Sequence, residues 1–338
     1  MALEVVKPGL LTTIQDLGRP GYFHLGIPMG GAMDRMALRA ANLLVGNAEG
    51  AAGLEAVFMG PELLFTSDAM VAVTGAELPI FVDDVEQPGW SAFPVKAGQR
   101  LGFGFLKAGA RAYIAISGGI DTPVMLGSRS TYAIGALGGV DGRAIAAGDE
   151  IPLGAPSGEA KEGATVAPDL RRPVGSPTEL RALPGLYWRR ITEEAQRGFF
   201  ADEWAVAPEA DRMGYRFRGG KPLEFVPREP PFGAGSDPSN IVDGCYPYGS
   251  IQVPGGTEPI VLHRDAVSGG GYFMIGTVIS ADMDLIGQLQ PHMPVKFVEV
   301  DMETALKARA DVAPGVVRIL AVEASRAMRD RRPGRRAA

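Results

Sequence analysis

The sequence has little cysteine and little histidine. Cys245 is the only cysteine among the 338 residues, and the three histidines, His24, His263 and His292, are far apart. A disulfide within the chain is therefore excluded, and a reducing compartment is favoured. Zinc sites usually draw on several closely spaced cysteine and histidine residues, so we predict no metal site. Any chemistry must then rest on Arg, Asp, Gln, Ser, Thr and backbone groups.

Other absences narrow the class of protein. No apolar run approaches the roughly 18 residues that are needed to span a membrane, and the N-terminus lacks the features of a signal peptide. A net charge of −6 is not that of a nucleic-acid-binding surface. The phosphate-binding loop, the nucleophile elbow, the zinc-protease motif and the Met-Lys-Met of biotin carriers are all missing. We therefore expect a cytoplasmic protein with no nucleic-acid or membrane partner and no biotin attached to this chain.

Glycine and proline, in contrast, are abundant, with 46 and 27 residues. They bound many short apolar runs, a pattern that is typical of β-strands joined by tight turns. Long helical periods are few, so we predict a mainly β protein with short helices, arranged as one or two closed barrels. The predicted strands cover residues 2–6, then LEAVFM, ELLFT, MVAVTG, PIFV, RLGFGFL and RAYIAISGG between 53 and 119, then ELRALPG, DRMGYRF, PLEFV, SIQVP, PIVLH and PVKFVEV.

Apolar periodicity also predicts a few helices and a division into two β-rich subdomains. The strongest helical period covers 33–44, and shorter ones predict helices over 192–199, 281–289, 302–308 and 316–328. Residues 154–178 are small, polar and proline-rich, as in a linker. The predicted division is an N-terminal β-rich subdomain (1–153), a linker (154–178), a C-terminal barrel (179–310), and a C-terminal helix with a basic tail (311–338).

The most distinctive stretch is Thr12–Asp34, which we call the opening stretch. It places Gln15, Asp16, Arg19 and Asp34 among five glycines and two prolines. Stiff loops that carry polar side chains are common binding sites, so we predict that these residues bind substrate and that Asp16 is catalytic. Asp34 would lie in the first turn of the helix that follows, where the helix dipole favours a carboxylate. The alternative is an ordered turn region in which Arg19 and Asp16 form only a local pair.

Two further patches add ionisable groups. The patch at 126–150 would form another wall of the site with the side chains Ser128, Arg129, Ser130 and Arg143. Arg212 and Arg216 are four residues apart, so in extended structure they would share one face. Arginine can bond both oxygens of a carboxylate, and we predict that this pair holds a carboxylate or carboxyphosphate-like group. The alternative is that each pairs with a structural acid.

A third patch, at 265–272, contains Asp265 and Tyr272. An aspartate and a tyrosine on a glycine-rich loop are candidates to polarise the substrate or to relay protons. We expect the polar side chains of all these patches to gather on one surface and to bind a compact anionic or amide-bearing molecule.

Taken together, the patches resemble a known family. It comprises the C subunit of 5-oxoprolinase, the kinase-inhibitor antagonist KipA, and the matching half of the urea carboxylase carboxyltransferase region (allophanate hydrolase subunit 2 type). The similar motifs include TTIQDLGRPGY (12–22), GGAMD (30–34), LGSRST (126–131), GGVDGR (138–143), DRMGYR (211–216), IQVPGGTEPIVL (251–262) and GGY (270–272). The resemblance adds Gln252, Gly270 and Gly271 to the candidate substrate-binding residues.

This resemblance implies a cyclophilin-like β-barrel and a function in a complex. A KipI-like B subunit and a lactam-utilisation A subunit would be the partners, and the chain, inactive without them, would help the complex to open a small cyclic amide with the use of ATP. Two alternatives remain within the family. One is a regulatory protein of the KipA kind that sequesters a kinase inhibitor, and the other is the carboxyltransferase half of a biotin-dependent carboxylase.

Three residues depart from the family pattern near the third patch. Val267 stands where a glutamine is common, Ser268 stands where a threonine is common, and Met274 stands where a basic residue is common. An apolar side chain in place of a cation would weaken the binding of a carboxylate. We therefore expect the substrate to be an amide or lactam other than 5-oxoproline itself.

Overall fold

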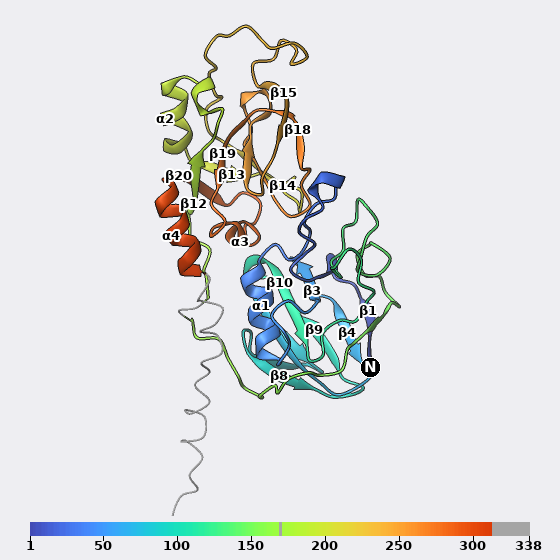
Figure 1. The fold of residues 1–338 in the computed structure, drawn as a ribbon. Helices are drawn as coiled ribbons and strands as arrows, with labels where there is room; N and C mark the ends of the chain where they lie inside the picture. Colours follow the sequence, from blue (N-terminus) through green and yellow to red (C-terminus); the bar gives the residue numbers. More distant parts are fainter. Residues whose placement is uncertain (169–170, 313–338) are drawn as a thin grey trace, which may run out of the picture.

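The computed structural model describes residues 1–168 and 171–312, and it is mainly β, as predicted (Figure 1). Two β-rich parts lie one above the other, the N-terminal part in blue to green and the barrel in yellow to orange. The last strand of the first part ends at Pro152, and the first strand of the barrel begins at Thr178. No helix within the described residues is long and apolar enough to cross a membrane.

The N-terminal part consists of two antiparallel sheets that share one apolar core. Leu3 and Phe65 of one sheet and Leu54 and Ile114 of the other are fully or almost fully buried in it. The two sheets are separate, so within the described residues the closed barrel is confined to the C-terminal part. In spatial order the strands are β11 (Glu150–Pro152), β1 (Ala2–Lys7), β4 (Glu62–Phe65), β9 (Arg100–Phe103), β6 (Ile80–Val82) and β7 (Val85–Gln87) in one sheet, and β2 (Leu11–Gln15), β3 (Gly53–Val57), β10 (Ala108–Ile116), β5 (Ala69–Glu77) and β8 (Ala92–Val95) in the other.

Helix α1 (Arg35–Leu44) packs on the outer face of the five-stranded sheet. Small side chains on both sides, Ala40 and Ala41 on the helix and Ala72 and Ala115 on the sheet, allow a close approach. The helix begins two residues later than predicted because Asp34 caps it and its side chain accepts a hydrogen bond from the Ala37 backbone N–H at 2.9 Å.

The barrel closes through seven strands, and its only parallel pair joins β12 to β20. Aromatic rings fill it, and Phe199 stacks on Phe297 with 4.8 Å between the ring centroids. Helices α2 (Glu193–Ala201) and α4 (Met302–Val312) lie along the same outer side, whereas α3 (Met283–Ile286) faces the N-terminal part (Figure 1). In spatial order the strands are β12 (Thr178–Pro184), β19 (Met274–Val278), β16 (Ser250–Gln252), β17 (Ile260–Leu262), β14 (Gly214–Arg218), β13 (Trp204–Val206) and β20 (Pro294–Glu299).

Several sequence predictions need correction here. The predicted strand PLEFV forms only an isolated bridge between Phe225 and Ile191. The helix predicted over 281–289 is a single turn, α3, whereas α4 continues past 308 to Val312. The helix predicted over 316–328 and the basic tail lie outside the described residues. The remaining elements are a two-stranded antiparallel sheet of β15 (Asn240–Cys245) and β18 (Gly269–Tyr272), and the 3₁₀ turns η1 (Phe23–Leu25), η3 (Trp188–Arg190) and η4 (Pro254–Gly256).

Candidate functional site

The opening stretch starts as a strand rather than as a loop, because residues up to Gln15 belong to β2 and pair with β3. The chain leaves the sheet at Asp16, whose carboxylate accepts four hydrogen bonds. The donors are the Gly18 N–H at 2.7 Å, the Ser128 hydroxyl at 2.6 Å, the Arg129 N–H at 2.6 Å and the Ser130 hydroxyl. Asp16 therefore joins the first two predicted patches, and four donors occupy most of the acceptor capacity of a carboxylate.

Arg19 points from the opening stretch into the protein and is only 1% exposed. Its Nη2 donates to the Ser130 carbonyl oxygen and its Nε to the Met125 carbonyl oxygen at 3.5 Å. Its Nη1 is buried and has no hydrogen-bond partner among the residues that the structure describes. Burial lowers the pKa of Arg19, and the carboxylates of Asp16 and Asp265 oppose this shift.

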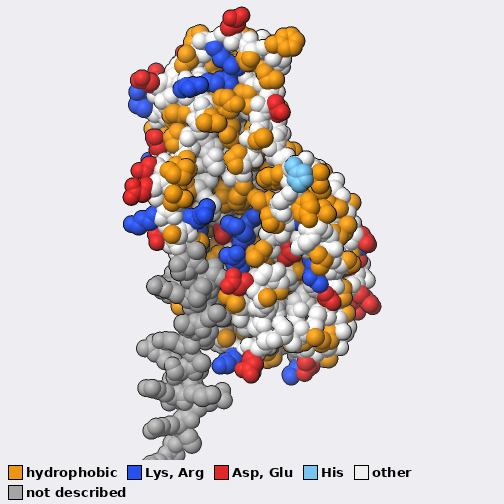
Figure 2. Space-filling model, in the orientation of Figure 1, with side chains coloured by type: hydrophobic (Ala, Val, Ile, Leu, Met, Phe, Trp, Pro, Cys, Tyr) orange, Lys and Arg blue, Asp and Glu red, His pale blue; other side chains and the backbone are white. Residues whose placement is uncertain are grey.

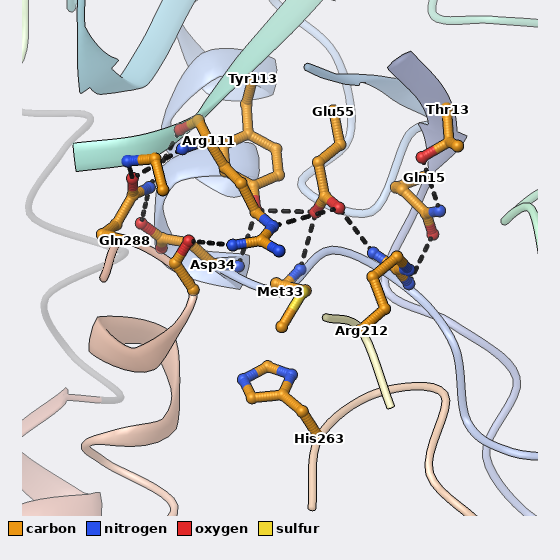
Figure 3. Close-up of polar contacts among 12 residues, drawn as sticks. Thr13, Gln15, Met33, Asp34, Glu55, Arg111, Tyr113, Arg212, His263 and Gln288 are labelled. Carbon is orange, nitrogen blue, oxygen red and sulfur yellow. Dashed lines mark hydrogen bonds and ion pairs between the residues drawn. The ribbon is translucent and has the colours of Figure 1, made fainter. Parts of the chain in front are cut away.

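Arg212 ties the barrel to the N-terminal part (Figure 3). Its Nε donates to Asp265 at 2.8 Å and its Nη1 to Glu55 at 2.6 Å, while Nη2 donates to the Gly31 carbonyl oxygen at 2.8 Å and lies 3.4 Å from the Gln15 amide oxygen. Burial alone would lower the pKa of Arg212, but Asp265 and Glu55 raise it above its ordinary value. The guanidinium is therefore a permanent cation whose donors are bonded on every side.

Glu55 lies on β3 between Arg212 and a second arginine of the N-terminal part. It accepts hydrogen bonds from the Tyr113 hydroxyl at 2.8 Å and the Met33 N–H at 2.9 Å, and Arg111 lies 3.8 Å away. Burial pushes the pKa of Glu55 upward, but Arg212 and Arg111 hold it below its ordinary value. The glutamate therefore stays ionised at the joint between the two parts.

We call the six charged groups at this joint the joint cluster. They are Arg19, Arg111, Arg212, Asp16, Glu55 and Asp265. Sequence reasoning selected four of them and missed Glu55 and Arg111. Each is the single charged residue in an apolar strand, Glu55 in LEAVF and Arg111 in RAYIAI. A charge in such a strand is rarely buried without a partner, so this pattern could have indicated a buried ion pair.

Asp34 lies on the far side of Glu55 from Arg212, as Figure 3 shows. Besides capping α1, its carboxylate accepts a hydrogen bond from the Gln288 amide at 2.9 Å. Burial, together with the nearby Asp284, raises the pKa of Asp34 to about 7. Asp34 lines a cleft of about 870 Å³ between the two parts, which Trp90 also lines. The structure thus places Asp34 at the joint but not beside the other predicted side chains.

The prediction that Arg212 and Arg216 share one face is wrong. Strand β14 begins only at Gly214, so the alternation of side chains does not extend back to Arg212, which lies in the preceding turn. Arg216 instead faces a groove of about 500 Å³ on the barrel surface and lies 4.0 Å from Glu258. We call it the barrel groove, and Gln252 and Tyr272 also line it.

The arginines of the second patch do not gather with the joint cluster either. The Arg129 guanidinium pairs with Asp121, so only its backbone N–H contacts Asp16. Arg143 forms a two-pronged ion pair with Asp149, at 2.7 and 2.9 Å, on the exposed surface. The expectation that all predicted arginines lie on one surface is therefore wrong. Gly270 and Gly271 lie in β18 of the two-stranded sheet.

The three departures from the family pattern have different surroundings. Met274 is buried in an apolar cluster with Tyr246, Ile260, Leu262 and Ala266. Val267 is half exposed and lines the barrel groove. The Ser268 hydroxyl donates to the Phe23 carbonyl oxygen at 3.1 Å, which joins η1 to the third patch.

The described residues contain no group of three or more His, Cys, Asp or Glu side chains arranged to hold a metal ion. The polar groups of the joint cluster are guanidinium, carboxylate, amide and hydroxyl groups. Groups of these kinds can bind an amide through hydrogen bonds.

Comparison with known proteins identifies the family. A model of the carboxyltransferase domain, subdomain A and B, matches residues 25–299. The C subunit of 5-oxoprolinase from Escherichia coli K12 is 37% identical over 310 residues, which are 91% of this chain and 94% of that protein. Urea amidolyase of Saccharomyces cerevisiae is 34% identical over 328 residues, 92% of this chain but only 17% of that protein.

Solved structures agree with this result. The crystal structure of Kluyveromyces lactis urea carboxylase superposes with a TM-score of 0.89 at 32% identity, covering 94% of this chain and 29% of that chain. The chain thus spans less than a third of these urea-metabolising proteins and nearly all of the bacterial subunit. It belongs to the carboxyltransferase subdomain A and B family, as the sequence motifs predicted.

Proposed function

We propose that this chain is the C subunit of an ATP-dependent complex of the 5-oxoprolinase type, which opens a small lactam together with a KipI-like B subunit and a lactam-utilisation A subunit. The observation that carries the proposal is the 37% identity to the C subunit of Escherichia coli 5-oxoprolinase over 94% of that protein. The joint cluster supports it, because its guanidinium and carboxylate groups lie together where the two parts of the chain meet.

The charges of the joint cluster favour a neutral substrate. The three guanidinium groups face three carboxylates, so a bound carboxylate would add an uncompensated negative charge, which is costly in a buried site. Met274 adds no cation, since it lies in an apolar cluster. A lactam without a carboxylate is therefore the substrate class that fits best.

In this reaction the chain binds and orients the amide. ATP is used by the complex, and this chain has no phosphate-binding loop of the P-loop type. Attack on an amide carbonyl places negative charge on its oxygen, and buried, preorganised donors stabilise such a charge. Arg19 is the buried cation proposed for this role, because one of its guanidinium nitrogens has no hydrogen-bond partner among the described residues, whereas the donors of Arg212 are already bonded.

Exposed apolar side chains near the joint cluster support the need for a partner. Figure 2 shows hydrophobic side chains gathered on this face of the N-terminal part, near the place where η1 projects in Figure 1. Met125 links them to the cluster, because its carbonyl oxygen contacts Arg19 and its sulfur accepts from the Gly138 N–H. The exposed apolar side chains are Leu25, Val124, Met125, Leu126 and Ile134. Covering such a surface is a typical role of another protein in a complex.

Co-expression of the three proteins tests the proposal. We expect ATP hydrolysis that depends on a lactam and on all three of them, in an assay with a panel of lactams and ureas. Arg212→Gln should lower kcat/KM by at least about tenfold, or about 1.4 kcal/mol, whereas Arg100→Gln, at an exposed pair with Glu62, should not. Co-purification and circular dichroism check that both variants assemble. Binding to the KipI-like partner without turnover of any substrate would instead favour a regulatory protein of the KipA kind.

The second candidate is the carboxyltransferase half of a biotin-dependent carboxylase. The superposition on Kluyveromyces lactis urea carboxylase, with a TM-score of 0.89, favours it. Biotin would then be attached to a separate carrier. Turnover that requires urea, a biotin carboxylase and a biotinylated carrier, and that avidin abolishes, would select this candidate over the lactam hydrolase.

A further inference from the structure

A pocket of about 430 Å³ opens at the end of the barrel that lies away from the N-terminal part, where β15 is labelled in Figure 1. Three arginines line it, Arg189, Arg190 and Arg228, and we call it the arginine pocket. Figure 2 shows Lys and Arg side chains gathered at this end of the barrel. These arginines belong neither to the joint cluster nor to the barrel groove, so the pocket is a separate feature of the chain.

Two of the guanidinium groups converge on one neutral acceptor. Arg190 Nη2 donates to the Asn240 carbonyl oxygen at 3.2 Å, and Arg228 Nη2 donates to the same oxygen at 2.9 Å. Arg190 Nη2 also donates to the Pro238 carbonyl oxygen at 2.6 Å. Burial and the neighbouring charge of Arg228 lower the pKa of Arg190. Two like charges are thus held close together, and a bound anion would relieve their repulsion.

The charges of the arginine pocket are not balanced by acids. Within the described residues none of its three arginines forms an ion pair, in contrast to Arg143 with Asp149. Asp243 supplies the one carboxylate of the lining, and this carboxylate accepts a hydrogen bond from the Gly244 N–H at 2.9 Å instead. The lining therefore carries three positive charges and one negative charge.

The three guanidinium groups differ in how they reach the pocket. Arg190 is half-buried and lies 5.2 Å from the ring centroid of Phe273 and 5.7 Å from that of Tyr187, so cation–π contacts hold it in place. Arg189 is exposed and donates no hydrogen bond to a described residue, and the exposed Arg228 uses only its Nη2. Arg190 therefore supplies a fixed charge, while donors of Arg189 and Arg228 are open to a ligand.

We propose that the arginine pocket binds the doubly charged phosphate group of a small molecule. A phosphate monoester carries a charge of about −1.5 to −2 at pH 7 and so matches the excess positive charge of the lining, whereas a carboxylate carries only one charge. A guanidinium group can bond two phosphate oxygens at once. Tyr187, Ile241 and Val242 line the same pocket and offer an apolar wall to the rest of the molecule.

This proposal goes beyond the proposed function, because it requires neither lactam hydrolysis nor the joint cluster. The site is made of side chains from two separate segments, η3 and the loop before β15, rather than of the backbone groups of a P-loop. A nucleotide and free phosphate both present the required chemistry, and the choice of probes separates these two sources.

Isothermal titration calorimetry on the isolated full chain tests the proposal with AMP, inorganic phosphate, adenosine and acetate, each in a buffer free of other phosphate. We expect saturable binding of AMP and none of adenosine, because the phosphate group carries the recognised charge. Tighter binding of AMP than of inorganic phosphate would support the site as one for a nucleotide, and equal binding would support it as one for free phosphate.

Three results would overturn the proposal. The first is that neither AMP nor inorganic phosphate binds saturably. The second is that adenosine binds as tightly as AMP, which would show that the phosphate group is not recognised. The third is that acetate binds as tightly as inorganic phosphate, which would show that the pocket does not select a doubly charged anion.

Variants locate the binding in the arginine pocket. Arg189→Gln removes a charge without removing a hydrogen bond to a described residue, and Arg228→Gln removes one such bond. We expect the double variant to raise the Kd for AMP by at least about tenfold, or about 1.4 kcal/mol. Arg197→Gln is the matched control, because it removes the same charge from α2, at an exposed pair with Glu193. Circular dichroism checks that the variants fold, and an equal change in Kd for Arg197→Gln and the double variant would overturn the proposal.

Discussion

Arg212 and Arg216 are four residues apart, yet they lie in two very different regions. In the joint cluster the Arg212 side chain is 13% exposed and contacts Asp265, Glu55 and a backbone carbonyl oxygen. In the barrel groove the Arg216 side chain is 44% exposed and lies 4.0 Å from Glu258. Arg212 therefore connects the two parts of the protein, whereas Arg216 lies on the surface of the barrel.

The difference shows how the start of a strand decides the role of a charge. Arg212 precedes Gly214, the first residue of β14, and contacts Glu55 and Gly31 of the N-terminal part. Residues after Gly214 alternate across the barrel wall, so Tyr215 and Phe217 are buried while Arg216 and Arg218 face outward. The joint cluster is thus built from turns and strand ends, and the barrel groove from the outer face of a strand.

The largest expected effect is the loss of Arg212. Arg212→Met should destabilise the chain by about 3–5 kcal/mol, because Glu55 and Asp265 would remain buried without their shared counter-ion. Arg216→Met removes only an exposed pair and should cost less than about 1 kcal/mol. Urea unfolding of both variants measures the difference. Equal destabilisation would show that burial does not distinguish the two arginines.

The next effect concerns the opening stretch that supports the joint cluster. A Cβ on Gly18 (φ +90°) would lie 2.5 Å from the Met29 carbonyl oxygen, whereas a Cβ on Gly21 (φ +100°) would have no atom within 4 Å. Both substitutions to Ala carry the strain of a left-handed backbone, about 1–2 kcal/mol, and Gly18→Ala adds a clash worth about 1–3 kcal/mol. The melting temperature of Gly18→Ala should therefore be lower than that of Gly21→Ala. The reverse order would contradict tight packing of the opening stretch.

The parts of this structure that the sequence predicted are those set by local pattern. Apolar periodicity located α1 and most strands, and the glycine-rich motifs identified the family. Among the candidate site residues, Asp16, Ser128 and Ser130 come together as the two glycine-rich patches suggested. These successes rely on short-range rules and on motif order.

The contacts that sequence reasoning missed depend on long-range packing. Glu55 and Arg111 come from apolar strands, and nothing local shows that Arg212, at a distant position in the sequence, completes their charge balance. Arg143 and Arg19 both lie in glycine-rich patches and were both predicted to bind substrate. Arg143, however, pairs at the surface with Asp149, six residues further along the chain. Which acid each arginine meets is decided by how the barrel docks on the sheets, and no spacing rule contains that information.

A smaller effect is the pH dependence of the joint. Burial and Asp284 raise the pKa of Asp34 from its ordinary 3.8 to about 7. Between these two pH values the folded state keeps a proton on Asp34 that the unfolded state has lost. The free energy of unfolding should therefore fall as pH rises from about 4 to about 7, and level off above that. Asp34→Asn keeps a capping oxygen and should flatten this slope.

Urea unfolding at several pH values checks the slope. Asp68→Asn is the control, because the exposed Asp68 accepts hydrogen bonds from the Ala97 N–H and from Lys96, which lower its pKa and place its titration below this window. An equal slope in the wild type and Asp34→Asn would show that Asp34 is ionised throughout, with Gln288 and the Ala37 N–H sufficient to hold the charge.

The smallest effect is expected at Arg143, which is exposed and pairs with a nearby residue, unlike Arg212. Asp149 bonds both prongs of Arg143, but it also accepts a hydrogen bond from the Ala146 N–H at 2.7 Å, which holds the turn when the arginine is removed. Arg143→Gln should therefore leave the melting temperature and the lactam-dependent ATP hydrolysis of the complex unchanged. Asp149→Asn should have a larger effect on melting, because it weakens the turn as well as the pair. A tenfold fall in kcat/KM for Arg143→Gln would contradict this expectation. It would indicate that Arg143 contributes to the site in the assembled complex.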